Sequence, residues 1–338
     1  MKNNIKKIFA LLIVVSMALS LAACGNSEPA EREFVVSDEL VEAAFIDLST
    51  EAVVNIFDEA AALGGEPALS TMLMPVASGT KTSGGNKAEI DYSNTNLGYV
   101  MVRYTQSTTQ RLKVQITGPS GVTYTYDLAS DNEFDTFPLS DGNGKYKIVV
   151  YKNISGTSYS TVHSFSTEVV LDNEFAPFLL PNQYVDYNEN SLCVAKAREL
   201  VAGKTETLDM VKAIYNYVVS NYSYDTYKAA TVESGYLPVL DDIYNEKKGI
   251  CFDYAALATA MLRSIDIPTK LVIGYSGTQY HAWINVYSEE SGWMTGVIFF
   301  DGETWKLMDP TFASSGRQSA SIMSYISNAS NYSAKYSY

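Results

Sequence analysis

The spacing of apolar residues changes once along this chain, and that change limits the fold more than any other feature. From residue 88 to residue 171, apolar and polar residues alternate in short runs, as in strands that bury one face. From residue 191 onward, longer runs predict helices at about Ser191–Ala202 and Leu208–Asn221, and strand-like runs follow them. We therefore expect an α+β protein with a block of strands followed by a mixed domain.

The alternating block predicts seven short strands separated by turn signals. They lie at Ala88–Tyr92, Tyr99–Thr105, Leu112–Thr117, Val122–Leu128, Asp135–Leu139, Lys145–Lys152 and Ser158–Val170. This arrangement is typical of an all-β immunoglobulin-like sandwich, here over residues 88–171, although no Cys–Trp–Cys signature is present. Such a domain would act as a platform for the domain at 172–338, or alternatively as a substrate-binding module.

The N-terminus has the features of a bacterial secretory signal. Three lysines precede an apolar run from Ile8 to Leu21, which falls short of the roughly 18–20 residues that span a bilayer. The run ends in Leu-Ala-Ala-Cys, which resembles the lipoprotein cleavage box and implies lipidation of Cys24. We expect a signal peptide at 1–23, a lipid anchor facing the extracytoplasmic side, and a tether with a helical segment (Phe34–Leu63) at 24–87.

Length and charge narrow the remaining choices. A chain of 338 residues with 46% hydrophobic residues is expected to form about two domains with sizeable cores. Its formal charge is −14 and no basic residues are clustered, which argues against nucleic acid as a partner.

The cysteines and histidines are few. If Cys24 is lipidated, Cys193 and Cys251 remain, and in an oxidising compartment they could form a disulfide. The alternative that we favour is two free thiols, with Cys193 buried on a helix face and Cys251 functional. Of the two histidines, His163 lies in the last predicted strand of the sandwich, and His281 opens an apolar strand-like run. This set does not make a metal site.

Three residues in the C-terminal part have the types that nucleophilic catalysis requires. Cys251 opens a helical run, where unpaired N–H groups and the helix dipole favour a thiolate and can hold an oxyanion. His281 follows a predicted loop at Gly274–Gly277 and could serve as the base, and Asp309 could orient the imidazole. Each residue alone also has a purely structural interpretation: a buried thiol, a packed histidine, and a turn-former before proline.

The residues around these three positions resemble the transglutaminase-like superfamily. The motif G-x-C-x-D-Y-A stands at Gly249–Ala255, H-A-W at His281–Trp283, and W-x-x-x-D-P-T at Trp305–Thr311. The helix-to-strand passage between the first two motifs is also similar, although Asp266 and Lys270 stand where the family usually has Gly and Arg. Three motifs in the family's order are far more specific than any one of them.

The resemblance implies a papain-related core, in which the helix bearing Cys251 packs on an antiparallel sheet bearing His281 and Asp309. It implies that Cys251 attacks a carboxamide to form a thioester, with His281 as base and then acid. Tyr224 is our candidate for a side-chain oxyanion donor. Trp283 and Trp305 are expected to flank the cleft, or else to pack in the core.

The expected function is that of a membrane-tethered thiol enzyme acting on amide bonds of peptides or proteins, without a cofactor or metal. The triad does not distinguish a peptidase or amidase from a cross-linking acyltransferase, and we lean toward hydrolysis. The alternative from another class is a catalytically idle cell-surface binding protein that uses the sandwich and keeps the second domain as a scaffold.

Overall fold

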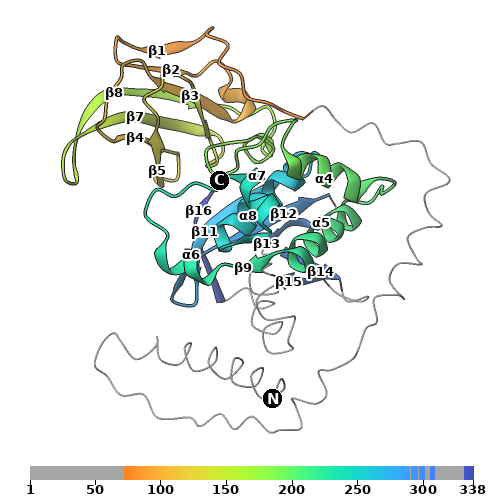
Figure 1. Ribbon diagram of the computed structural model, residues 1–338. Coiled ribbons are helices and arrows are strands. Elements are labelled where there is room, and N and C mark those ends of the chain that lie inside the picture. The colour runs from red at the N-terminus through yellow and green to blue at the C-terminus, as the bar shows by residue number, and fades with distance from the viewer. Residues whose placement is uncertain (1–71, 290, 296, 301–304, 309–330) are drawn as a thin grey trace, which may run out of the picture. The chain divides into compact units, whose positions relative to one another are not determined.

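The computed structural model describes residues 72–338, apart from 290, 296, 301–304 and 309–330 (Figure 1). Contacts divide the chain into two units, Met1–Thr50 and Glu51–Tyr338, and every described residue belongs to the second. The predicted signal peptide, the lipidation site at Cys24 and the predicted helical segment Phe34–Leu63 lie outside the described residues. Within the described residues, no helix has the length and apolar character needed to cross a membrane.

Two antiparallel sheets occupy the first part of the described chain. One has the order β1-β2-β3-β6, and the other has the order β5-β4-β7-β8. Their strands are β1 (Thr82–Gly84), β2 (Ala88–Asp91), β3 (Tyr99–Tyr104), β4 (Leu112–Thr117), β5 (Thr123–Leu128), β6 (Asp135–Pro138), β7 (Gly144–Ser155) and β8 (Ser158–Val169). Strands β2 to β8 confirm the seven that the sequence predicts. The short strand β1 was not predicted, because its residues Thr-Ser-Gly carry no alternation of apolar and polar side chains.

Alternation gives both sheets their buried faces. In β4, Leu112, Val114 and Ile116 are buried, and the polar residues between them are partly exposed. Inward residues of both sheets, such as Ile90 and Val114, belong to one hydrophobic cluster. The sheets therefore share a core, whereas their assignment as an immunoglobulin-like sandwich stays a prediction. His163 of β8 lies 3.0 Å from the Ser83 hydroxyl, measured from its Nε2, which fits its expected structural role.

Five α-helices are described in the C-terminal part. They are α4 (Leu192–Val201), α5 (Thr207–Asn221), α6 (Thr226–Thr231), α7 (Leu240–Glu246) and α8 (Cys251–Arg263), preceded by the short 3-10 helix η4 (Ala176–Phe178). Helices α4 and α5 confirm the two that were predicted, and α8 confirms the helix that opens at Cys251. Helices α6 and α7 were not predicted, because they are short and lie on either side of the helix-breaking residues Gly235 and Pro238.

The strands of this part form one larger sheet and two pairs. The larger sheet is antiparallel with the order β13-β12-β11-β16, and the pairs are β14-β15 and the parallel β9-β10. The strands are β9 (Ser223–Tyr224), β10 (Lys248–Gly249), β11 (Thr269–Ser276), β12 (Gln279–Ser288), β13 (Gly292–Thr295), β14 (Val297–Phe300), β15 (Trp305–Met308) and β16 (Tyr332–Ser337). The expected loop at Gly274–Gly277 is wrong, since β11 continues to Ser276 and only a tight turn precedes β12.

Helix α8 lies at the centre of the C-terminal part. It contacts α4, α5 and α7 on one side and β11 and β12 on the other (Figure 1). Its residues from Asp253 to Arg263 are all buried, as expected for a helix that is covered all round. The molecule is thus a mixed α and β structure in which the described larger sheet supports the cysteine-bearing helix.

Candidate active site

The thiol of Cys251 lies on the first turn of α8, directly after the N-cap residue Ile250. Cys251 is free and, like Phe252 after it, partly exposed, whereas the helix is buried from Asp253 onward. The first N–H groups of a helix have no partners within it and carry its positive partial charge. The chain therefore presents a partly exposed thiol beside the unpaired N–H groups of a helix N-terminus.

Asp253 makes α8 begin at this point. Its Oδ2 accepts a hydrogen bond of 2.8 Å from the Ile250 backbone N–H, so that the side chain closes the helix N-terminus. The fold-back needs a glycine at 249, since a Cβ there would lie 2.6 Å from the Asp253 Cβ. This contact explains why Gly and Asp flank the cysteine in the first motif.

Two side chains from another segment bind the Asp253 carboxylate. The Lys228 ammonium lies 2.7 Å from Oδ2, and the Tyr236 hydroxyl donates to Oδ1 at 2.6 Å. Asp253 is fully buried, whereas Lys228 is partly exposed. Burial raises the pKa of Tyr236 well above its usual value, and the neighbouring carboxylate of Asp253 adds to that effect. Sequence reasoning missed Lys228 and Tyr236.

His281 lies in β12, the strand that packs directly against α8. Its imidazole is almost fully buried and stacks on Trp283, with ring centres 6.3 Å apart. The structure therefore places His281 and Cys251 on elements that contact each other, as the sequence predicts.

The strand pairing around His281 depends on Gly274. This glycine stands opposite His281 in the β11–β12 register. A Cβ at Gly274 would lie 2.1 Å from the Ser333 backbone oxygen and 2.8 Å from Trp283 Cη2. The Trp283 indole and strand β16 thus occupy the space that the missing side chain leaves.

Of the remaining predicted site residues, the structure describes Trp283 fully, the backbone of Trp305, and nothing of Asp309. Trp283 is 1% exposed and packs edge-on against Tyr332, with ring centres 5.3 Å apart, so in this structure it lies in the core and not on an open surface. Trp305 begins β15, and Asp309 lies outside the described residues. The position of Asp309 relative to His281 stays a prediction.

Tyr224 lies beside the motif that carries the nucleophile. It pairs with Gly249 in the parallel bridge between β9 and β10. The next residue, Asp225, donates its backbone N–H to the Gly249 oxygen at 2.8 Å. The chain thus places Tyr224 level with the start of α8, which fits the predicted oxyanion donor without testing it.

The second thiol has a very different environment. Cys193 lies in α4, is fully buried and forms no disulfide. Burial raises its pKa to about 12, and the negative charge of Asp241 contributes. Both cysteines in the described part of the chain are therefore free thiols, and of these two only Cys251 is partly exposed.

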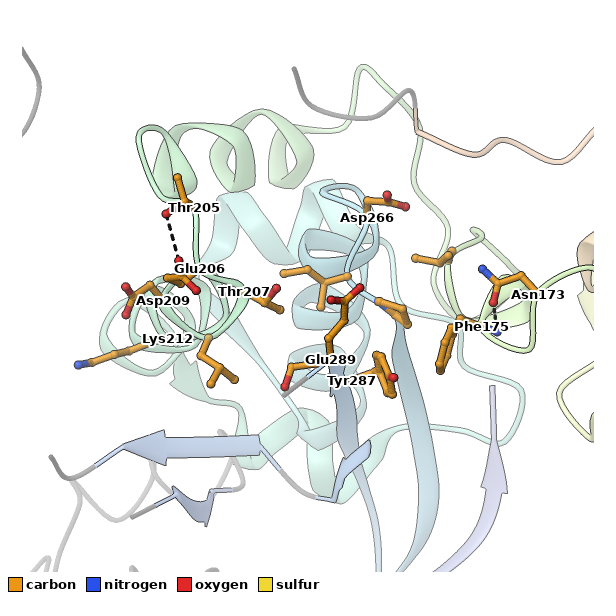
Figure 2. Close-up of a pocket in the computed structure, with 15 residues that line it drawn as sticks. Asn173, Phe175, Thr205, Glu206, Thr207, Asp209, Lys212, Asp266, Tyr287 and Glu289 are labelled. Atoms are coloured by element: carbon orange, nitrogen blue, oxygen red, sulfur yellow. Dashed lines mark hydrogen bonds between the residues drawn. The ribbon is translucent and has the colours of Figure 1, made fainter. Parts of the chain in front are cut away.

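A cavity of about 730 Å³, whose lining side chains are drawn in Figure 2, does not include Cys251. It opens between the start of α5 and the turn from α8 to β11, at the other end of α8. Four of its lining residues are acidic and one is basic. They are Glu206, Asp209, Asp266, Glu289 and Lys212. Among the described residues that line it there is no cysteine or histidine, so it is separate from the candidate catalytic site.

Across the described parts of 72–338, no group of three His, Cys, Asp or Glu is arranged to hold a metal ion.

With this geometry in place, the sequence match identifies the domain. Residues 194–296 match the model of the Transglutaminase-like superfamily. This part of the chain is therefore a transglutaminase-like domain, which confirms the assignment made from the motifs. The matched range includes Cys251 and His281 and ends before Asp309.

Similar proteins are known, at low identity. Over 118 residues the chain is 27% identical to the uncharacterized protein YebA of Bacillus subtilis (strain 168), which covers 29% of this chain but only 16% of that protein. A proposed cysteine protease of Cytophaga hutchinsonii aligns with 71% of this chain and 76% of its own, at 16% identity and a TM-score of 0.35. A red sea bream transglutaminase aligns with 68% and 53%, at 14% identity and a TM-score of 0.24. The family assignment rests on the sequence match alone.

Proposed function

We propose that the protein is an extracytoplasmic thiol enzyme, tethered to a membrane through Cys24, that acts on amide bonds of peptides or proteins. One observation carries this proposal: Cys251 is a free, partly exposed thiol at the start of a buried helix that packs against the strand bearing His281. The transglutaminase-like domain supports a thiol mechanism.

The proposed reaction has two stages. The Cys251 thiolate adds to the carbonyl carbon of a substrate amide, and the carbon–nitrogen bond breaks to leave a thioester. His281 takes the thiol proton and passes it to the departing nitrogen, while Asp309 orients the imidazole. The N–H groups at the start of α8, together with Tyr224, would stabilise the oxyanion. Attack of water on the thioester gives hydrolysis, which we favour because water is always present outside a cell, and attack of an amine gives transfer.

The test is to incubate a peptide pool with the wild type, Cys251→Ala and the control Cys193→Ala, and to analyse products by mass spectrometry. Hydrolysis of backbone amides gives new termini, whereas transfer gives loss of ammonia together with cross-links. Cys251→Ala should lose all product formation, and Cys193→Ala should keep it, because Cys193 is buried in α4. If the wild type binds peptides but forms no product, the alternative of an idle surface-binding protein replaces this proposal.

The membrane tether has its own test. Cys24→Ala should move the protein from the membrane fraction to the soluble fraction, since lipidation requires the thiol. An unchanged distribution would contradict the anchor and leave the proposed chemistry untouched.

A further inference from the structure

A buried negative charge lies beneath the start of α8. The Asp253 carboxylate is fully buried and reaches back to the Ile250 N–H, one residue before the candidate nucleophile Cys251. Asp253 and Cys251 both lie in the first turn of α8. A negative charge in the same turn as a thiol disfavours the thiolate, whereas the helix N-terminus favours it. Without compensation, Asp253 would therefore oppose the effect of the helix on Cys251.

Lys228 of α6 provides that compensation. Its ammonium pairs with Asp253 Oδ2 at 2.7 Å and donates to the Tyr236 hydroxyl at 2.5 Å. The ammonium also lies 4.3 Å from the centre of the Tyr236 ring. Asp225 fixes the position of α6, because its Oδ1 accepts the Lys228 backbone N–H at 2.9 Å. Within the described part of the chain, no other cation pairs with Asp253.

The other charged and titratable groups near this site are accounted for by their own partners or positions. From β10, Lys248 pairs with Asp225 at 3.2 Å. From β12, which packs against α8, the titratable groups are the buried His281 and its exposed neighbour Tyr280. From α7, two carboxylates act on the Tyr236 hydroxyl at longer range. They are Asp242 and Glu246.

We propose that Lys228 is a positioning residue for Cys251, because its ammonium neutralises Asp253 and lets the positive end of α8 act on the thiol. The inference rests on the proposed nucleophilic role of Cys251. It adds a residue, more than twenty positions earlier in the chain, that sets the reactivity of the nucleophile without touching substrate.

The experiment measures the rate of Cys251 alkylation by iodoacetamide against pH, in the full chain and resolved by residue with mass spectrometry. The thiolate displaces iodide and forms a sulfur–carbon bond, so the rate follows the thiolate fraction. Cys193 is buried and should not be alkylated in the folded protein. Lys228→Met should raise the pH of half-maximal rate by about 1–2 units. The matched control Lys248→Met removes a neighbouring lysine that pairs with Asp225 and not with Asp253. It should shift the pH of half-maximal rate, here called the midpoint, by less than about 0.5 unit.

Two further variants separate charge from scaffolding. Asp253→Asn keeps an acceptor for the Ile250 N–H but removes the negative charge, so the midpoint should fall. In the double variant Lys228→Met with Asp253→Asn, both charges are gone, and the midpoint should return to within about 0.5 unit of the wild type. If Lys228 only clamped α6 in place, the double variant would not recover.

Equal midpoints for the wild type, Lys228→Met and Asp253→Asn would overturn the inference. If Lys228→Met does not fold, the sign of the Asp253→Asn shift and the retention of the wild-type midpoint in Lys228→Arg decide the question. The alkylation measurement does not depend on turnover, so it tests this inference separately from the proposed function. A protein that cleaves no peptide can still show these shifts, and an active protein can lack them.

Discussion

The two ends of α8 both bury a charged side chain, and they hold it in different ways. At the start, Asp253 is bound by Lys228, Tyr236 and the Ile250 N–H. At the end, the Arg263 guanidinium donates only to backbone oxygens. These are Leu180 O at 2.6 Å, Thr269 O at 2.9 and 2.7 Å, and Tyr338 O at 2.7 Å.

The charge around the start of α8 can therefore change, whereas the charge around its end is constant. Side chains at the start can titrate or be substituted singly, so the environment of Cys251 depends on a balance of charges. The amide oxygens of Leu180 and Thr269 at the other end do not titrate, and Arg263 therefore acts as an anchor for the helix. Burial does lower the pKa of Arg263, to about 10.

The largest effect is expected from breaking the anchor. Arg263→Met removes the guanidinium donors from the buried oxygens of Leu180 and Thr269 and one of the two donors of the Tyr338 oxygen, and should lower the free energy of unfolding by about 3–5 kcal/mol. Chemical denaturation measures this loss. The exposed control Arg111→Met should stay within about 0.5 kcal/mol of the wild type. A loss no larger than that of the control would refute the anchor.

A smaller loss is expected from crowding the start of the helix. Gly249→Ala would bring a Cβ to 2.6 Å from the Asp253 Cβ and 2.9 Å from its Oδ2, so the carboxylate could not fold back. We expect a loss of about 1–3 kcal/mol in unfolding free energy together with slower alkylation of Cys251. Gly85→Ala is the matched control, because its Cβ would meet no atom within 4 Å.

Removing one donor at the start should cost less again. Tyr236→Phe deletes the 2.6 Å hydrogen bond to Asp253 but keeps the ring, so about 1–2 kcal/mol of unfolding free energy should be lost. Lys228 still neutralises Asp253, and the alkylation midpoint should therefore move far less than in Lys228→Met. A shift as large as that of Lys228→Met would show that the hydroxyl, and not the ammonium, sets the reactivity.

The smallest expected effect is an increase in the free energy of unfolding, from a substitution just after the end of α8. Asp266 has φ +66°, a left-handed conformation that favours glycine, which the family usually has at this position. Asp266→Gly should raise the free energy of unfolding by about 0.5 kcal/mol. The same change at the helical residue Asp209 should lower it by a similar amount, and thermal unfolding distinguishes the two signs.

The sequence predicted those features that depend on local pattern. Alternation located β2 to β8, and the run after Cys251 located α8. Strand β1 has only the residues Thr82–Gly84 and carries no apolar pattern, and the short helices α6 and α7 lie on either side of Gly235 and Pro238. Their existence follows from tertiary contacts and not from local preference.

At the site, the motifs located the cysteine and histidine but not what controls them. Asp253 belongs to the first motif, so its presence was visible, yet Lys228 and Tyr236 lie 25 and 17 positions away. No spacing rule connects such residues, because the connection arises only when α6 packs at the start of α8. The sequence offered one signal for such a cation: the carboxylate of Asp253 caps the helix that carries the candidate nucleophile, and a buried charge requires a partner.

Strand β16 sets a limit on how fast this domain can form. It pairs with β11 although more than fifty residues separate the two strands, and Tyr338 just beyond it exchanges backbone hydrogen bonds of 3.0 and 2.8 Å with Leu271. Closing such a long loop is entropically costly, and pairings of high sequence separation slow folding. The sheet beneath α8 can therefore be completed only after residues 332–338 have been synthesised, so until then the nascent domain exposes an open β11 edge to partners that can aggregate with it.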